Sequence, residues 1–498
     1  MIKNFKWLFL VAATFIACES DDETTAVVEE PLTAGSANFT KFVALGNSLT
    51  AGFSDNALFI EGQKGSYTNI LAQQFAKVGG GEFKIPFMAD NIGGLLFGGA
   101  ANPRFGPRLY FNGAGPVPVS GTSTTDVFVP NTSGLYNNMG VPGAKSYHLL
   151  FDGYGNSANL ALGLANPYFV RFASDPNKSI LYHAMAQSPT FFSLWIGNND
   201  VLGYATAGGV TTAQDPIDGG DITPPSGAPG VGFDGTYGAL VTTLTSGGAK
   251  GVVANIPYVS SIPFFTTVPF NPLVLPQTSV DALNTAYAQY NGGLAVALAN
   301  GLISAEEKAA RTIVFKATGA DGKPFSNPVV IVDEYLTIIN FGGGVILPNY
   351  RQATKEDFLV LKSKTDSLTA PFFQAGNGSQ FPLADRFVLS KNEVAELKTA
   401  TDAYNATIET LATSKGLAFF DAKKLMSQVA TTGVSSNGYT VRSTYVTGGG
   451  FSMDGVHPSP RGYALIANAF MDAINKKYGS NLKPVDISKY RVQFPSSL

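Results

Sequence analysis

Short hydrophobic runs alternate along the chain with longer amphipathic stretches. The short, continuously apolar runs predict buried strands at Phe42–Leu45, Phe191–Ile196, Gly251–Ile256, Val329–Val332 and Leu417–Phe420. Hydrophobic residues at helical spacing predict helices between them at Tyr67–Val78, Ser179–Ala186, Tyr237–Thr245, Val280–Ala299, Lys355–Leu361, Lys391–Ser414 and Arg461–Lys476. Because strands that alternate with helices favour a parallel sheet covered on both faces, we expect an α/β fold with a three-layer, doubly wound parallel sheet.

Several stretches do not belong to a minimal fold of this kind. The chain has 55 Gly and 29 Pro residues, a content that predicts long ordered loops. We expect one domain over residues 39–480, a C-terminal tail over 481–498, and insertions near 80–135, 206–232, 258–276 and 315–390. Insertions on the rim of a sheet are where substrate contacts usually lie.

The N-terminus has the pattern of a targeting segment. Lys3 and Lys6 precede an apolar run, Trp7–Ala17, which is too short to span a bilayer as a helix. The run ends at Cys18, the only cysteine of the chain, and Ala17-Cys18 resembles a bacterial lipobox in which the cysteine is lipidated. We therefore expect a lipoprotein signal peptide at 1–17, although an ordinary secretory signal with an incidental cysteine is the alternative.

Residues 18–38 contain six acidic residues and no basic one. A segment with low hydrophobicity and charge of one sign is expected to be a solvated tether. An acidic stretch directly after a lipidated cysteine also resembles the surface-export signals of some bacterial lipoproteins. The expected location is therefore the bacterial cell envelope, with the protein held at the membrane by an N-terminal lipid.

Charge and composition exclude some functions and leave others open. The formal net charge is -3, which gives no basic footprint for nucleic acid. No His-x-x-x-His pair and no cysteine cluster is present, so the sequence predicts neither a metal site nor a cofactor. The oligomeric state is left open.

Two distant segments carry the candidate chemistry. Ser48 follows the first predicted strand, at the turn into a helix whose free N–H groups and dipole would face an oxyanion. Asp454-Gly455-Val456-His457 lies near the other end of the chain, and the i, i+3 spacing lets Asp454 and His457 share one side of a helical turn. A serine paired with a histidine and an aspartate is the arrangement of a nucleophilic hydrolase.

Four blocks of the chain, taken in order, resemble the SGNH (GDSL) hydrolase family: Gly46-Asn47-Ser48-Leu49-Thr50, Asn138–Ala144, Gly197-Asn198-Asn199-Asp200 and Asp454–His457. The resemblance spans residues 42 to about 475 and implies a flavodoxin-like α/β fold. It implies that Ser48 is the nucleophile, that His457 is the base and that Asp454 orients the imidazole. It also implies an oxyanion hole made by the Ser48 and Gly143 backbone N–H groups and the Asn199 amide, with Gly140 as a second candidate. Asn47 departs from the family, which usually has Asp there.

Each of these residues also has a simpler interpretation. Ser48 is a suitable helix N-cap, Asn199-Asp200 a suitable cap or turn, and His457 a possible surface histidine. The chain has only three histidines, however, and neither His148 nor His183 has an aspartate three residues before it.

The leading hypothesis is a serine esterase that hydrolyses a lipid or acyl ester outside the cytoplasm. The apolar segment 258–276 and the Phe-containing insertion 80–135 favour an acyl-binding groove, although apolar loop residues often simply pack. Two alternatives use the same scaffold: a carbohydrate O-deacetylase, or a non-catalytic surface lipoprotein that binds glycan or lipid.

Overall fold

The structure is a computed structural model, and it describes residues 30–131, 134–361 and 370–498. The chain divides into a short N-terminal unit, residues 1–32, and one compact unit, residues 33–498. The predicted signal peptide, Cys18 and most of the acidic segment lie outside the described residues. Among the residues that are described, no helix is both long and apolar enough to cross a membrane.

A parallel sheet of five strands forms the centre of the compact unit. Its strands, in spatial order, are β17 (Ala418–Phe420), β8 (Lys250–Ala254), β7 (Phe191–Trp195), β1 (Phe42–Gly46) and β6 (Asn138–Gly140). Every neighbouring pair is parallel. If these five strands are renumbered 1 to 5 along the chain and read from β6, the order is 2-1-3-4-5. The direction of winding therefore changes between β1 and β7. The strands are buried because helices cover both faces, which explains their continuously apolar sequences.

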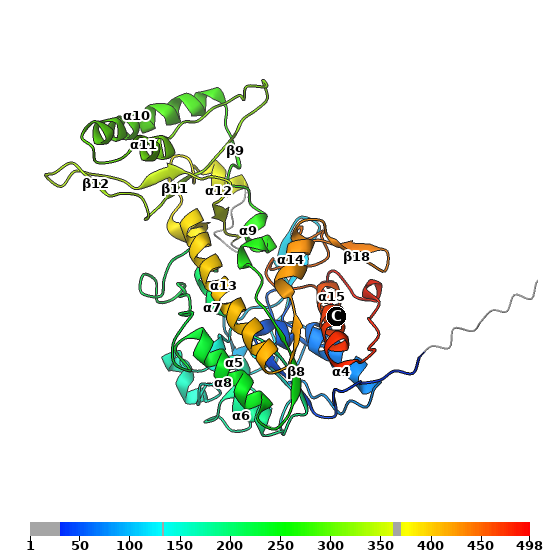
Figure 1. The fold of residues 1–498 in the computed structure, drawn as a ribbon. Coiled ribbons are helices and arrows are strands. Elements are labelled where there is room, and N and C mark those ends of the chain that lie inside the picture. Colours follow the sequence, from blue (N-terminus) through cyan, green and yellow to red (C-terminus); the bar gives the residue numbers. More distant parts are fainter. Residues whose placement is uncertain (1–29, 132–133, 362–369) are drawn as a thin grey trace, which may run out of the picture. The chain divides into compact units, whose positions relative to one another are not determined.

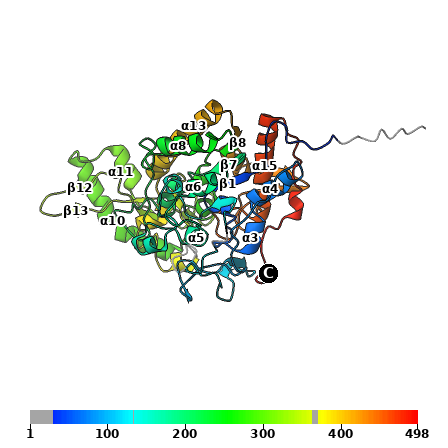
Figure 2. The ribbon, with the colours of Figure 1, turned by 90° about the horizontal axis from the view of Figure 1, so that it is seen from below.

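The sheet lies between two groups of helices (Figure 1, Figure 2). One face is covered by α4 (Tyr67–Ala76) and α15 (Pro460–Tyr478), and the other by α6 (Ile180–Met185), α8 (Phe233–Thr245) and α13 (Lys391–Ser414). Two of the long helices begin at side-chain caps that the sequence supplies: Ser390 with Glu393 at α13, and Ser459 followed by a proline at α15. The mixed α/β architecture with a parallel sheet is therefore as expected.

One predicted strand lies outside the central sheet, and one predicted helix is wrong. The apolar run Val329–Val332 forms β11 (Val330–Val332), but this strand pairs antiparallel with β14 (Tyr350–Gln352) outside the central sheet. Lys355–Leu361 is not a helix but contains β15 (Phe358–Leu359), which pairs with β16 (Val388–Leu389). The fifth strand of the sheet is β6, three residues that are too few to give a periodic pattern. Neighbouring strands rather than local propensity decided these cases.

The described residues within 273–361 and 370–388 build a second hydrophobic core, and we call this part of the chain the lobe. Its helices α10 (Gln277–Ala299) and α11 (Ala305–Arg311) lie side by side (Figure 1). They pack with two-stranded sheets formed by β9 (Leu273–Val274) and β10 (Ser326–Asn327), β11 and β14, and β12 (Ile339–Asn340) and β13 (Ile346–Leu347). Helix α12 (Ala370–Gln374) also belongs to this part of the chain.

The other segments are mostly irregular. Residues 80–135 carry the hairpins β2 (Leu96–Phe97) with β3 (Ala100–Ala101) and β4 (Leu109–Phe111) with β5 (Pro116–Pro118), whereas residues 207–232 carry no helix or strand. At the ends of the unit, the Ser36 N–H donates to the Tyr478 carbonyl, and the ring of Phe494 packs on Phe59. The remaining α-helices and β-strands of the described residues are α2 (Ser48–Ala51), α3 (Ile60–Lys64), α5 (Pro167–Val170), α7 (Asn199–Thr206), α9 (Pro263–Thr266), α14 (Ala422–Ala430), β18 (Val434–Ser436) and β19 (Tyr439–Val441).

Candidate active site

Ser48 lies at a tight turn between β1 and α2. A Cβ on Gly46 would lie 2.2 Å from Thr50 Oγ1 and 2.5 Å from the Trp195 carbonyl oxygen, so only glycine fits at the end of the strand. Asn47 is the N-cap of α2, and its Oδ1 accepts a hydrogen bond from the Leu49 N–H. Ser48 is therefore the first residue of the helix, and its backbone N–H has no acceptor within the helix.

Ser48, His457 and Asp454 form a continuous hydrogen-bonded relay. Ser48 Oγ lies 2.9 Å from His457 Nε2, and His457 Nδ1 lies 2.8 Å from Asp454 Oδ2. The ring of Phe53 lies 4.6 Å from the imidazole, centroid to centroid, and limits its movement. The distances are those required for a base to take the serine proton while a carboxylate holds the other ring nitrogen.

Asp454 sits in an irregular turn rather than in the helical turn that the sequence suggested. Its Oδ1 accepts from the backbone N–H groups of Val456 and His457, so the carboxylate itself organises the turn. An isolated bridge between Phe451 and Pro458 closes the loop on both sides. The i, i+3 spacing therefore reflects an aspartate that caps its own turn, and helical periodicity plays no part.

The surroundings keep Asp454 ionised. Burial opposes ionisation, but the imidazole of His457 and the N–H donors of His457 and Val456 outweigh it and hold the pKa of the Asp454 carboxyl at about 2. A carboxylate that stays ionised at neutral pH can stabilise the imidazolium formed when His457 takes a proton.

Three supporting residues were missed in the sequence. The Asn56 N–H donates to Asp454 Oδ2, the Ser452 hydroxyl donates to Asp454 Oδ1, and the Asp55 N–H donates to Ser452 Oγ. Asp55 and Asn56 both have positive φ angles, 51° and 64°. Adjacent Asp and Asn residues are among those that tolerate this conformation, and that was the available signal.

The two other proposed oxyanion donors follow β7 and β6, the two strands on either side of β1. Asn199 begins α7, after β7, and its Nδ2 donates one hydrogen bond to the Ala144 carbonyl oxygen at 2.9 Å, which fixes the amide and leaves its second N–H. Asp200 accepts from both the N–H and the hydroxyl of Ser146 and holds the same loop. The third group of the site, Gly143, lies on this loop, after β6.

Gly143 suits an oxyanion donor better than Gly140 does. The Gly140 N–H donates to Asn138 Oδ1, and a Cβ at this position would lie 2.3 Å from the Ala51 nitrogen. Gly143 is exposed, has a φ of 81°, and its N–H meets no acceptor within the described part of the chain. Gly140 therefore serves close packing, whereas the Gly143 N–H is open to a ligand.

The helix dipole that the sequence led us to expect at Ser48 contributes little. Helix α2 has only four residues, too few for a substantial macrodipole. What α2 offers is a single backbone N–H at a fixed position. The position of Ser48 in the sheet still favours ligand binding, because ligands of open α/β sheets bind outside the carboxyl ends of the strands, where the order of winding reverses. Ser48 after β1 and Asn199 after β7 lie on the two sides of that point.

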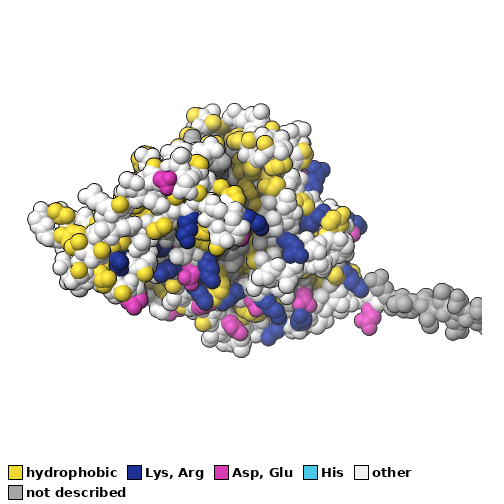
Figure 3. All heavy atoms as spheres, turned by 90° about the horizontal axis from the view of Figure 1, so that it is seen from above, with side chains coloured by type: hydrophobic (Ala, Val, Ile, Leu, Met, Phe, Trp, Pro, Cys, Tyr) yellow, Lys and Arg dark blue, Asp and Glu magenta, His cyan; other side chains and the backbone are white. Residues whose placement is uncertain are grey.

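A cavity of about 110 Å³ adjoins Ser48 and His457. Its polar lining side chains are those of Asn47, Ser48, Asn198, Asn199 and His457. Its remaining lining is apolar and comes from the segment after β8, from α14 and β19, and from α15: Pro257, Val259, Ile262, Ala422, Leu425, Met426, Val429, Val441, Leu465 and Ile466, with Leu49, Trp195, Leu202, Phe420, Phe451, Val456 and Pro458. On the face drawn in Figure 3, hydrophobic side chains gather in a hollow near its middle. Helix α14, which the sequence pattern did not reveal, contributes much of this lining.

The two other histidines serve local structure. His148 Nδ1 accepts from the Lys145 N–H, and burial lowers the pKa of His148 to about 4. His183 bonds through its two ring nitrogens to the Ser179 carbonyl and the Asp175 N–H. Both are therefore engaged away from Ser48.

A scan against protein-family models, a search of curated proteins and a search of solved structures each find no match to this chain. The geometry of the site is therefore the basis for assigning a function.

Proposed function

We propose that this chain is a serine esterase that hydrolyses carboxylic esters with an apolar acyl group. One observation carries the proposal: the hydrogen-bonded relay Ser48–His457–Asp454 opens onto an apolar cavity. A serine, a histidine and a buried carboxylate in this order activate a hydroxyl for attack on an acyl carbon.

In the proposed reaction, His457 Nε2 takes the proton of Ser48 while Ser48 Oγ forms a bond to the ester carbonyl carbon. The carbonyl oxygen becomes an oxyanion, which accepts hydrogen bonds from the Ser48 and Gly143 N–H groups and from Asn199 Nδ2. One such donor is worth about 3–4 kcal/mol of barrier. The C–O bond to the alcohol then breaks, and the alcohol leaves with the proton from His457. Water repeats the sequence and releases the acid and free Ser48.

The finer assignment is to the SGNH (GDSL) hydrolases. The strand order 2-1-3-4-5 is the flavodoxin-like one. The four sequence blocks that resemble the family supply the nucleophile, the two other oxyanion donors and the base with its carboxylate. Asn47, where the family usually has Asp, caps α2 through its Oδ1, and its Nδ2 lies 3.4 Å from Asn198 Oδ1.

The cavity favours a lipid or fatty-acyl ester. A site for an acetylated carbohydrate needs polar groups along the pocket for sugar hydroxyls, but here the polar side chains gather at the Ser48 end. One water needs about 10–15 Å³ of such space. The cavity of about 110 Å³ is several times that minimum, so it has room for several carbon atoms of an acyl chain.

Carbohydrate deacetylation remains the second candidate, supported by the exposure of Gly143. A non-catalytic lipid- or glycan-binding lipoprotein is the third. Both share the scaffold and differ from the first proposal in measurable ways.

The enzymatic proposal is tested with a fluorophosphonate probe and a series of p-nitrophenyl esters from acetate to laurate, run beside acetylated xylan. We expect the probe to label wild-type protein and the exposed-serine control Ser435→Ala, but not Ser48→Ala. We also expect kcat/KM to rise from acetate to a medium chain length. Near wild-type turnover by Ser48→Ala refutes the assignment, and preference for xylan supports the second candidate. A wild-type chain that is folded, unlabelled and inactive supports the third.

We also propose that Cys18 carries lipid and holds the protein in the bacterial cell envelope. The short apolar run Trp7–Ala17 before the lone cysteine and the acidic residues after it support this. Mass spectrometry of the native N-terminus is expected to show acylated Cys18. An unmodified terminus, or membrane retention of processed Cys18→Ser protein, contradicts it.

A further inference from the structure

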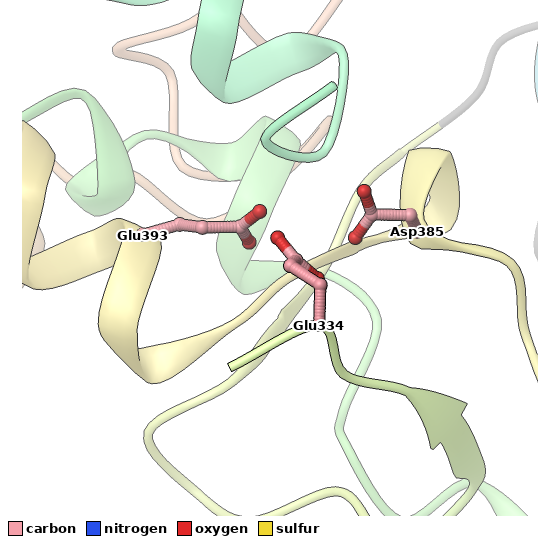
Figure 4. A group of neighbouring side chains, drawn as sticks. All are labelled: Glu334, Asp385 and Glu393. Carbon is pink, nitrogen blue, oxygen red and sulfur yellow. The ribbon is translucent and has the colours of Figure 1, made fainter. Parts of the chain in front are cut away.

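Three carboxyl groups converge away from Ser48, at the junction of the lobe and the central α/β core. They belong to Glu334, which follows β11, to Asp385, and to Glu393 in the first turn of α13 (Figure 4). One potential ligand oxygen from each side chain lies within 4.8 Å of the other two. Glu334 is exposed, Asp385 is half-buried and Glu393 is fully buried.

Glu393 has a buried oxygen without a partner. Its Oε2 accepts from the Ser390 N–H at 2.6 Å as part of the helix cap, but Oε1 has no hydrogen bond within the described chain. A Cβ on Gly209 would lie 1.5 Å from this Oε1, so the glycine keeps space for it. Figure 4 shows the carboxylate of Glu393 directed toward Glu334. A buried, unpaired carboxylate oxygen is costly unless a ligand or proton completes it.

The protein supplies little positive charge to this group. The nearby Arg351 guanidinium is shared between two other carboxylates: Nε donates to Asp333, and Nη1 and Nη2 donate to Asp357. The three carboxyl groups thus need protons or a cation to lie together.

We propose that Glu334, Asp385 and Glu393 bind one Ca²⁺ ion. The donors are all carboxylate oxygens, which suit hard cations and not Zn²⁺ or Cu²⁺. Oxygens on opposite sides of Ca²⁺ lie about 4.6–5.2 Å apart, twice the Ca–O distance, so a separation of at most 4.8 Å between the ligand oxygens is compatible with one ion. Mg²⁺ requires its oxygens within about 4.2 Å of one another and a stricter geometry. Water completes the coordination on the exposed Glu334 side.

The ion would join two separately packed cores. Glu334 extends from β11, whose residues lie in the core of the lobe, whereas α13 packs its Leu397 into the main core. A second link crosses the same junction without a metal: Glu396 accepts from the hydroxyls of Tyr204 on α7 and Tyr335 in the lobe. The bound Ca²⁺ therefore stabilises the attachment of the lobe, independently of any hydrolysis.

The test uses the full chain, freed of metal with EDTA and returned to chelator-free buffer. Isothermal titration with CaCl₂ and with MgCl₂ gives stoichiometry and affinity, and thermal melts with and without 2–5 mM CaCl₂, roughly saturating, give stabilisation. Glu334→Gln tests an exposed ligand and so preserves folding, and Glu393→Gln tests the buried one. Glu409→Gln, an exposed glutamate on the same helix α13, is the matched control.

We expect one Ca²⁺ per chain, bound more tightly than Mg²⁺, and a higher Tm in Ca²⁺. We expect Glu334→Gln to weaken Ca²⁺ binding by about tenfold or more, and Glu409→Gln to leave it unchanged. Absence of saturable binding overturns the proposal, as does binding that Glu334→Gln leaves intact. A Glu393→Gln variant that is more stable without metal, in a protein that binds no Ca²⁺, shows instead that the carboxyl groups share protons. Tighter Mg²⁺ binding refutes the choice of ion.

Discussion

Replacement of Asp454 by asparagine keeps the shape of the side chain but changes one of its two oxygen acceptors into an NH₂ donor. In the protein, Oδ2 faces two donors, the Asn56 N–H and His457 Nδ1, and Oδ1 faces the Val456 N–H, the His457 N–H and the Ser452 hydroxyl. The amide NH₂ of Asp454→Asn therefore meets backbone donors in either orientation. The less costly one places NH₂ beside His457 and leaves the Asn56 N–H as the unpaired group.

That orientation changes the tautomer of His457. To accept from the new NH₂, Nδ1 must lose its hydrogen, and the ring proton moves to Nε2, where it blocks transfer from Ser48. The same change in a protease triad lowers kcat by about 10⁴-fold. We expect a loss of about 10³–10⁴-fold in kcat/KM, equivalent to about 4–5.5 kcal/mol. The unpaired Asn56 N–H should lower stability by about 1–3 kcal/mol.

Asp454→Ala provides the critical comparison. It removes the carboxylate without introducing a donor, so Nδ1 can keep its hydrogen and Nε2 can still accept the serine proton in a poorer orientation. We therefore expect Asp454→Ala to retain more activity than Asp454→Asn, although alanine deletes more atoms. Asp472→Asn, which removes an exposed carboxylate paired with Lys476, controls for the change in net charge.

The assay is kcat/KM on p-nitrophenyl butyrate for the three variants, with circular dichroism melts to show folding. Because the native pKa of Asp454, about 2, is below its ordinary 3.8, the carboxylate stabilises the fold above about pH 3.8 and loses this effect as the pH falls through about 2. The stability difference between wild type and Asp454→Asn should therefore shrink at pH 2. Asp454→Asn activity equal to or above that of Asp454→Ala would refute the tautomer explanation.

Three further predictions concern the surroundings of the relay. Burial raises the pKa of Asp55 to about 7, so the native state keeps this proton to a higher pH than the unfolded state does. The free energy of unfolding therefore falls as the pH rises from about 4 to about 7, and Asp55→Asn should remove up to about 4 kcal/mol of this decline. Equal slopes of Tm against pH in both proteins would contradict the prediction. Met426→Trp should fill the apolar cavity and lower kcat/KM for octanoate and laurate esters more than for acetate, and a uniform loss would show that this side chain does not border the acyl chain. Gly46→Ala should destabilise the protein by about 1–3 kcal/mol, because its Cβ meets Thr50 and the Trp195 backbone, and an unchanged urea midpoint would contradict that contact.

The sequence by itself determined the features that depend on neighbours along the chain. The predicted helix Lys391–Ser414 coincides with α13, because its capping serine, its Glu at the third position and its apolar stripe are all local. The buried strands at Phe42, Phe191, Gly251 and Leu417 were legible because parallel strands covered on both faces are apolar throughout. Motif blocks also placed Ser48 after a strand and Asp454 three residues before His457.

Only the tertiary structure decided which distant groups meet. The apolar run at Val330 joined the lobe because antiparallel pairing with β14 was open to it, and β6 entered the central sheet although its three residues carry no pattern. Asn56 came to Asp454, and Asp55 to Ser452, across about 400 residues of chain. Glu334, Asp385 and Glu393 lack any ligand spacing in the sequence. Local periodicity records burial but not partners, and partners are fixed when elements pack together.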